Sequence, residues 1–206
     1  MRTDTLEAYL EQLAAKVPAP GGGATAALHA AQAAALVGMV AHYSVGARFA
    51  AHAEEIGDIA GHAEQLREEA LGLAEDDAAA FTAVTRAYRL PKETSADAAD
   101  RSAAIAGALV TAAQVPAAVI AVAERVVTLT ERLGPISNRN VVSDVAAAAE
   151  AARAAATTAR VNVEINLAGI TAPDIRRDLL RATGAVDDLA RRAEQVTTVV
   201  RDGLAR

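Results

Sequence analysis

Apolar residues recur at helical spacing along nearly the whole chain. Between residues 50 and 89 they follow one another three or four positions apart, which is the repeat of one helix face. The members of this stripe are Ile59, Ala63, Leu66, Ala70, Leu73, Asp77, Phe81, Val84 and Tyr88. Residues 24–44 are apolar on almost every side, which predicts a helix wrapped by other helices.

Four more helical segments complete the predicted bundle, at residues 4–15, 101–133, 144–168 and from Asp174 onward. Pro116 lies inside one of them and is expected to kink it. Residues 161–167 alternate like a strand, but they follow a helical run without a breaker, so we predict helix. We therefore expect a single all-α domain over residues 1–206, a bundle of about six helices with one long central helix.

A proline- and glycine-rich stretch, residues 17–23, separates the first two predicted helices. Its two prolines hold the chain extended, and Gly21, Gly22 and Gly23 follow directly. We expect the next helix to begin at Ala24 or Thr25. A glycine loop before a helix N-terminus suits an anion, because free N–H groups point outward there. Equally, glycine lets one helix pass close to another, and the sequence leaves both interpretations open.

Asp77 is the one carboxylate in the long apolar stripe. A buried carboxyl group loses hydration, which raises its pKa and lets it exchange protons near neutral pH. The alternative is a structural role, in which Asp77 pairs with an arginine or a helix N-terminus. The pattern favours function.

Further polar residues are candidates for binding a ligand: Asn138, Asn140, Ser143, Asp144, Asn162, Asn166 and Lys92. The first four cluster where a helix is predicted to start, so they could also be an ordinary cap and turn. Asn162 and Asn166 are one helical turn apart and could face one ligand or bond between helices. Lys92 follows a helix end and could hold an anion or complement the helix dipole.

Composition narrows the function classes. The chain is 52% apolar but only 2% aromatic, so its core is built from Ala, Val, Leu and Ile. A net charge of −6 gives no indication of a nucleic-acid partner. Cysteine is absent, which excludes thiolate chemistry. His29 and His42 are 13 residues apart without acidic companions, so no metal site is predicted.

Residues 24–41 raise the question of a membrane span, but His29 and Gln32 interrupt the run, which favours a buried helix over membrane attachment.

Four blocks of sequence resemble the formiminotetrahydrofolate cyclodeaminase / methenyltetrahydrofolate cyclohydrolase family. They are residues 18–23 (PAPGGG), residues 77–81 continuing to the LPK of 90–92, Val115-Pro116, and the NxNxxSD of 138–144 with residues 162–167. Each block is weak alone, but their order and spacing agree with the family over essentially the whole chain.

The resemblance implies an all-α homodimer in the cytoplasm that acts on one-carbon units of tetrahydrofolate. Its expected reaction is either hydrolysis of the methenyl form or cyclisation of the formimino form with release of ammonia. Asp77 matches the family's essential aspartate, and the glycine loop matches its folate-site loop. Neither reaction needs a metal or a redox cofactor. The glutamate tail of folate would offer an anion to the loop or to Lys92.

Four positions depart from the family pattern. Ala24 stands where a serine is usual, Ala47 begins a pair that is usually basic, Ala106 replaces a common glutamine, and Ser137 replaces a glycine. These departures concern the substrate more than the fold. Two alternatives therefore stay open: the same fold acting on another small molecule, and a non-catalytic helical dimer that binds folate or a partner.

Overall fold

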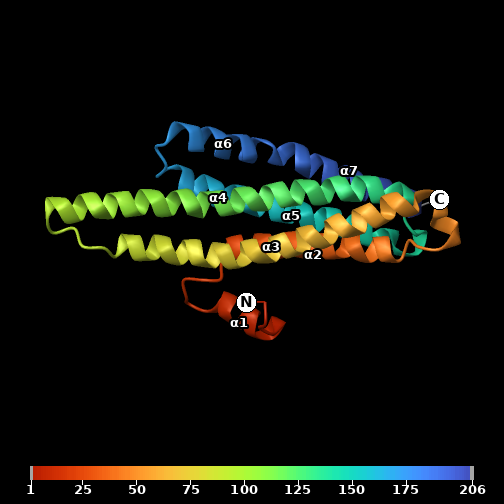
Figure 1. Ribbon diagram of the computed structural model, residues 1–206, viewed down its shortest axis with the longest axis horizontal. Helices are drawn as coiled ribbons and strands as arrows, with labels where there is room; N and C mark the ends of the chain where they lie inside the picture. The colour runs from red at the N-terminus through yellow and green to blue at the C-terminus, as the bar shows by residue number, and fades with distance from the viewer. Residues whose placement is uncertain (1, 205–206) are drawn as a thin grey trace.

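The chain folds into an elongated bundle of helices, which the computed structural model describes for residues 2–204 (Figure 1). The α-helices of this part are α1 (Leu6–Ala14), α2 (Gly22–His42), α3 (Ala53–Tyr88), α4 (Ser95–Leu133), α5 (Val142–Leu167), α6 (Pro173–Gly184) and α7 (Val186–Leu204). Short 3₁₀ helices η1 (Ala47–His52), η2 (Gly134–Ile136) and η3 (Arg139–Val141) join some of them. Residues 2–204 contain no strand, and the all-α prediction is confirmed.

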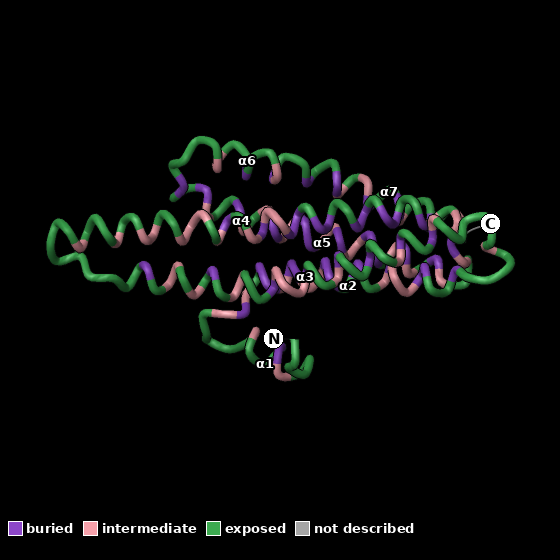
Figure 2. Tube along the Cα trace, in the orientation of Figure 1, coloured by how far each residue is buried: buried purple, intermediate pink, exposed green. Residues whose placement is uncertain are grey.

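Helix α2 is the buried centre of the bundle and packs against α3, α4 and α5. Most of its inward positions are alanine, and Figure 2 shows the buried residues concentrated along these facing helices. Alanines with no exposed surface include Ala26, Ala27, Ala30, Ala33 and Ala34 on α2 and Ala148, Ala149, Ala152, Ala155 and Ala156 on α5. Such small side chains let helix axes approach closely, and dispersion contacts are gained along their whole length.

Several helix ends differ from the prediction. Helix α2 begins at Gly22, so two of the three glycines are helical. Helix α4 begins at Ser95 because Thr94 and Asp97 form a reciprocal capping box, which the polar composition of this segment concealed. The last predicted helix is two helices, α6 and α7, joined at Ala185. Residues 161–167 are helical, as predicted.

Helix α1 stands away from the bundle in Figure 1. Arg2 ties this segment to α3 through Glu68, at 2.7 Å between Nη1 and Oε2, and through Glu75. On α1 itself, the Tyr9 hydroxyl lies 3.3 Å from that of Thr25 on α2. Leu6 on the same helix is 72% exposed, so the apolar side of α1 is largely uncovered within one chain.

Two helical segments are long and apolar enough to cross a membrane, judged by length and composition alone: α2 and residues 95–136. More than half of the α2 window is buried among other helices. A core helix of a soluble protein passes the same test, so this is weak evidence for a span.

Candidate active site

A cavity of about 360 Å³ lies where the N-terminus of α2 meets α3 and α5. It is lined by Val17, Pro18, Ala19, Pro20, Gly21, Gly22, Gly23, Asp77, Ala80, Phe81, Val84, Ala112, Asn162, Ile165 and Asn166. The structure thus brings together three of the features that the sequence marked separately: the proline-glycine stretch, the stripe carboxylate and the two asparagines of one helical turn.

Gly23 is where the Asp77 carboxyl group rests on the backbone of α2. A Cβ atom added at this position would overlap both carboxylate oxygens of Asp77. At Gly22 an added Cβ would make only an ordinary contact, 3.8 Å from Asn162 Nδ2, and at Gly21 it would touch nothing. The third glycine is therefore needed for close approach, and what approaches is a carboxyl group.

Asp77 also caps α2 from another helix. The N-cap residue of α2 is Gly21, which has no side chain to bond the free N–H groups of the first turn. The Asp77 carboxylate accepts a hydrogen bond from the backbone N–H of Ala24. Ala24 is the third helical residue, whose N–H an N-cap side chain ordinarily bonds. A negative charge here also complements the helix dipole.

Burial raises the pKa of Asp77 above its ordinary value, and this outweighs the opposing effect of the Ala24 N–H, which favours the ionised form. Asp77 thus meets a helix N-terminus, as the structural alternative expected, and its carboxyl group holds a proton more tightly than a solvated one; its catalytic role stays a prediction. It is half-buried and faces the cavity, so a ligand can reach it.

Asn162 and Asn166 form the α5 wall of the cavity. Asn162 donates from Nδ2 to the Thr158 carbonyl at 2.9 Å. Asn166 donates from Nδ2 to its own helix and, at 3.2 Å, to the Ala112 carbonyl on α4. These bonds use both amide N–H groups of Asn166 and one of the two of Asn162, which leaves both amide oxygens to accept, and one Asn162 N–H to donate, hydrogen bonds to a ligand.

The cavity also has an apolar rim, to which Phe81 and Ile165 contribute. Phe81 was expected on the buried face of its helix but is 49% exposed, and Ile165 is 75% exposed. Both line the cavity. Exposed large apolar side chains beside a carboxyl group and two amides suit a ligand with a flat apolar part and polar edges. Ile165 follows Asn162 by three residues and precedes Asn166 by one. This spacing was the sequence signal that could have identified Ile165 as a cavity residue.

The remaining predicted binding residues do not line this cavity. Lys92 follows the C-terminal end of α3, where its backbone N–H donates to the Glu93 carboxylate at 2.8 Å. Asn138 donates from Nδ2 to the Tyr43 carbonyl and accepts from the Asn140 N–H, so these two residues form a capped turn. This is the structural alternative considered for the cluster.

Ser143 and Asp144 were expected to cap α5, but they lie in its first turn, after the N-cap residue Val141. Ser143 is 19 residues before Asn162 on the same helix, a separation of about 28 Å at 1.5 Å per residue. The length of α5 therefore places these residues and the cavity at opposite ends of this helix.

Thr25 and the histidines also lie outside the cavity lining. The Thr25 hydroxyl donates to the Gly21 carbonyl at 3.0 Å, which links the first turn of α2 to the glycine stretch. His29 has a buried Nδ1 without a hydrogen-bond partner, and His42 ends α2. Within residues 2–204 no three His, Asp or Glu side chains are grouped so as to hold a metal ion.

Gly23→Ala is expected to lower the free energy of unfolding by about 1–3 kcal/mol, because the new methyl group displaces Asp77. Gly22→Ala is the matched control: it makes an ordinary contact and stays within about 1 kcal/mol of the wild type, with a tendency to stabilise. Urea unfolding measures both. Equal effects of the two substitutions would contradict the close approach of Asp77 to Gly23.

The raised pKa of Asp77 makes stability depend on pH. The folded protein keeps this proton to higher pH than the unfolded chain, so stability should fall as pH rises from the unfolded pKa, about 3.9, through the raised folded pKa. Asp77→Asn cannot ionise and should remove this fall in urea unfolding measured across that range. Asp76→Asn, on the exposed side of α3, should keep it. An Asp77→Asn profile parallel to that of the wild type would show that burial does not disfavour ionisation.

Comparison with known proteins places this arrangement in a family. A family model described as formiminotransferase-cyclodeaminase matches residues 5–184. A methenyltetrahydrofolate cyclohydrolase from Methylorubrum extorquens is 39% identical over 168 residues, which are 81% of each chain. The formimidoyltransferase-cyclodeaminase of Rattus norvegicus is 31% identical over 172 residues, 81% of this chain but only 31% of the rat protein.

A solved structure extends the likeness to the whole fold. The formiminotetrahydrofolate cyclodeaminase from Thermotoga maritima superposes with a TM-score of 0.86 at 27% identity, covering 100% of this chain and 99% of that one. The matched proteins are enzymes by name, and the matched region includes the glycine stretch, Asp77 and both cavity asparagines. This chain therefore belongs to the formiminotransferase-cyclodeaminase family of enzymes.

Proposed function

We propose that this enzyme interconverts 5,10-methenyltetrahydrofolate and 10-formyltetrahydrofolate, with Asp77 as the general acid and base. The observation that carries the proposal is the half-buried Asp77 carboxyl group, with its raised pKa, in a cavity lined by the glycine stretch and two amides. The similarity to a cyclohydrolase over 81% of both chains supports this reaction.

The chemistry needs one proton carrier beside the reacting carbon. Water adds to the methenyl carbon while the Asp77 carboxylate accepts one of its protons. The neutral adduct then collapses: the bond from carbon to N5 breaks, Asp77 returns its proton to N5, and the hydroxyl proton passes to solvent as the formyl group forms. Each turnover consumes one water molecule, releases one proton and restores the carboxylate.

The lining of the cavity fits the parts of such a substrate. Phe81 and Ile165 offer apolar surface to a flat ring, and the amide oxygens of Asn162 and Asn166 can accept hydrogen bonds from its edge N–H groups. The backbone of Gly21 and Gly22 gives a surface without side chains at the start of α2, which suits an anionic group.

The second candidate reaction is cyclisation of 5-formiminotetrahydrofolate. The fold similarity to a named cyclodeaminase over the whole chain favours it. In that reaction N10 attacks the formimino carbon, and Asp77 as an acid protonates the departing ammonia. The same residue and cavity serve both reactions, so the substrate supplied decides between them.

We also propose that the enzyme works in the cytoplasm as a homodimer. Large apolar side chains are exposed on α1 and on the outer part of α3, including Leu6, Leu10, Phe81 and Tyr88. Exposed apolar patches of this kind mark interaction surfaces. Phe81 also lines the cavity, so a second copy covering this face would border the substrate.

Asp77→Asn is expected to lower kcat for loss of methenyltetrahydrofolate, followed by its absorbance, by about a hundredfold or more, because the amide carries no exchangeable carboxyl proton. Asp76→Asn is the control and should keep wild-type activity. Full activity in Asp77→Asn would make this residue purely structural. If the wild type accelerates neither this reaction nor formimino cyclisation, the substrate is not one of these folates.

Light scattering should give a mass twice that of the 21.0 kDa chain. Leu10→Glu places a charge on the exposed apolar side of α1 and should shift the protein towards monomer. Glu11→Gln, on the polar side of the same helix, should leave the dimer intact. A wild-type protein that is monomeric at all concentrations tested would contradict the dimer.

A further inference from the structure

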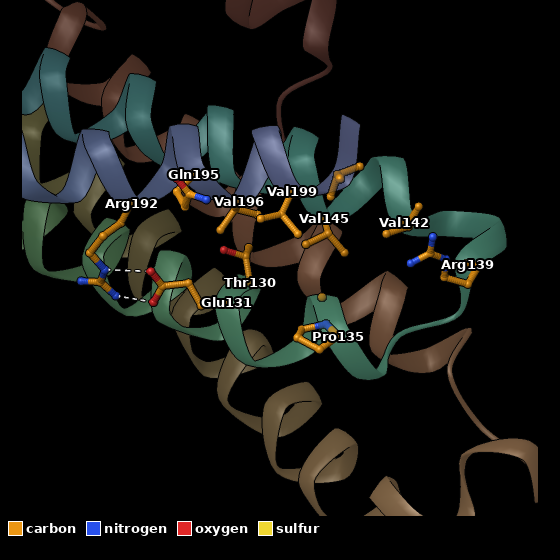
Figure 3. A pocket seen from close by; sticks show the side chains of 12 residues that line it. Thr130, Glu131, Pro135, Arg139, Val142, Val145, Arg192, Gln195, Val196 and Val199 are labelled. Atoms are coloured by element: carbon orange, nitrogen blue, oxygen red, sulfur yellow. Dashed lines mark hydrogen bonds and ion pairs between the residues drawn. The ribbon is translucent and has the colours of Figure 1, made fainter. Parts of the chain in front are cut away.

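A second cavity, of about 300 Å³, lies at the other end of the bundle, where α4, η2 and the start of α5 meet α7. Figure 3 shows its lining. Most of the lining is apolar, contributed by Pro135, Val142, Val145, Val196, Val199 and Val200. The polar members are Thr130, Glu131, Arg139, Arg192 and Gln195.

This cavity is separate from the one at Asp77. The two share no lining residue. Both touch α5, but Val145 and Asn162 are 17 residues apart on that helix, which is about 25 Å. A molecule bound here could not contact Asp77, so this cavity has no part in the reaction proposed above.

The charged side chains of the lining leave one positive charge without an acidic partner. Glu131 and Arg192 form a two-pronged ion pair, with 2.9 Å between Nε and Oε1 and 2.6 Å between Nη2 and Oε2 (Figure 3). The two charges of this pair cancel each other, and the pair forms part of one wall of the cavity. The Thr130 hydroxyl is also occupied, because it donates to the Val127 carbonyl at 2.7 Å.

Arg139 lies at the opposite end of the valine row from Arg192 in Figure 3. Its guanidinium donates from Nη2 to the Gly203 carbonyl at 3.3 Å, and no carboxylate within residues 2–204 forms an ion pair with it. A guanidinium has five N–H donors in a planar fork, so most of its capacity remains for a carboxylate. The cavity thus combines an apolar floor with a single unpaired cation at its rim.

We propose that this cavity binds a small aliphatic monocarboxylate, with the hydrocarbon chain among the valines and the carboxylate paired with Arg139. No aromatic side chain lines the cavity, so a stacked base or ring is not favoured. A single net positive charge matches a single negative charge. One water occupies about 30 Å³ of liquid, so the space holds on the order of ten non-hydrogen atoms, which is the size of octanoate.

Titration calorimetry of octanoate with the intact wild-type protein tests the proposal, and binding is expected. Arg139→Gln should weaken it about tenfold or more, because a charge-assisted hydrogen bond is lost. Val199→Trp should abolish binding by filling the mouth; Val199 is 60% exposed, so the larger side chain does not strain the core. Arg181→Gln, an exposed arginine of α6, is the control and should bind as the wild type does.

Two further probes separate the contributions. Octanol has the same chain without the charge, and should bind weakly and equally to the wild type and Arg139→Gln. Asp77→Asn should bind octanoate normally, which separates this cavity from the catalytic one. The proposal is overturned if octanoate does not bind the wild type at millimolar concentration, if Arg139→Gln or Val199→Trp binds it unchanged, or if Asp77→Asn loses it.

Discussion

The contact between the Asp77 carboxyl group and the backbone at Gly23 sets the geometry of the candidate active site. It requires a glycine at the second residue of α2, and it supplies the cap that Gly21 cannot provide. It also fixes how far α3 lies from the start of α2. Because α2 is the buried centre of the bundle, the helices packed around it are positioned relative to this helix end. The proline-glycine stretch is then held above α3 as one wall of the cavity.

The same contact explains how one residue can brace a helix end and still hold a proton more tightly than a solvated carboxyl group. A carboxylate that caps a helix is stabilised as an anion, whereas one that is withdrawn from water is destabilised as an anion. At Asp77 burial is the stronger effect, so the pKa is raised although the helix N-terminus opposes it. Because only one N–H donor faces the carboxylate in this partly closed site, Asp77 retains its proton to higher pH than a solvated carboxyl group does. Additional donors at this helix end would favour permanent ionisation and make the group a poorer acid.

Periodicity was sufficient to predict the helical bundle and to single out Asp77, because both depend on patterns within one helix. What the sequence could not provide was pairing between helices. The start of α2 was misplaced since its cap comes from α3, more than fifty residues away. The Asn138 to Asp144 cluster was assigned to the site because nothing local reveals that α5 carries it to the far end. Phe81 was placed in the core because its stripe is continuous, but it is 49% exposed and lines the cavity. The Arg139 cavity is assembled from separate segments and had no sequence signature.

The alanine core has a mechanical consequence for α5, the helix that borders both cavities. Its middle is packed through Ala148, Ala152, Ala155 and Ala156, none of which has exposed surface. Alanine has no side-chain rotamers, so this interface has no soft torsions with which to absorb a displacement. Longer side chains could change rotamer and repack, whereas the methyl groups of alanine can move only with their helix backbone. Helix α5 is therefore held stiffly along its middle, so each cavity it borders has one rigid wall.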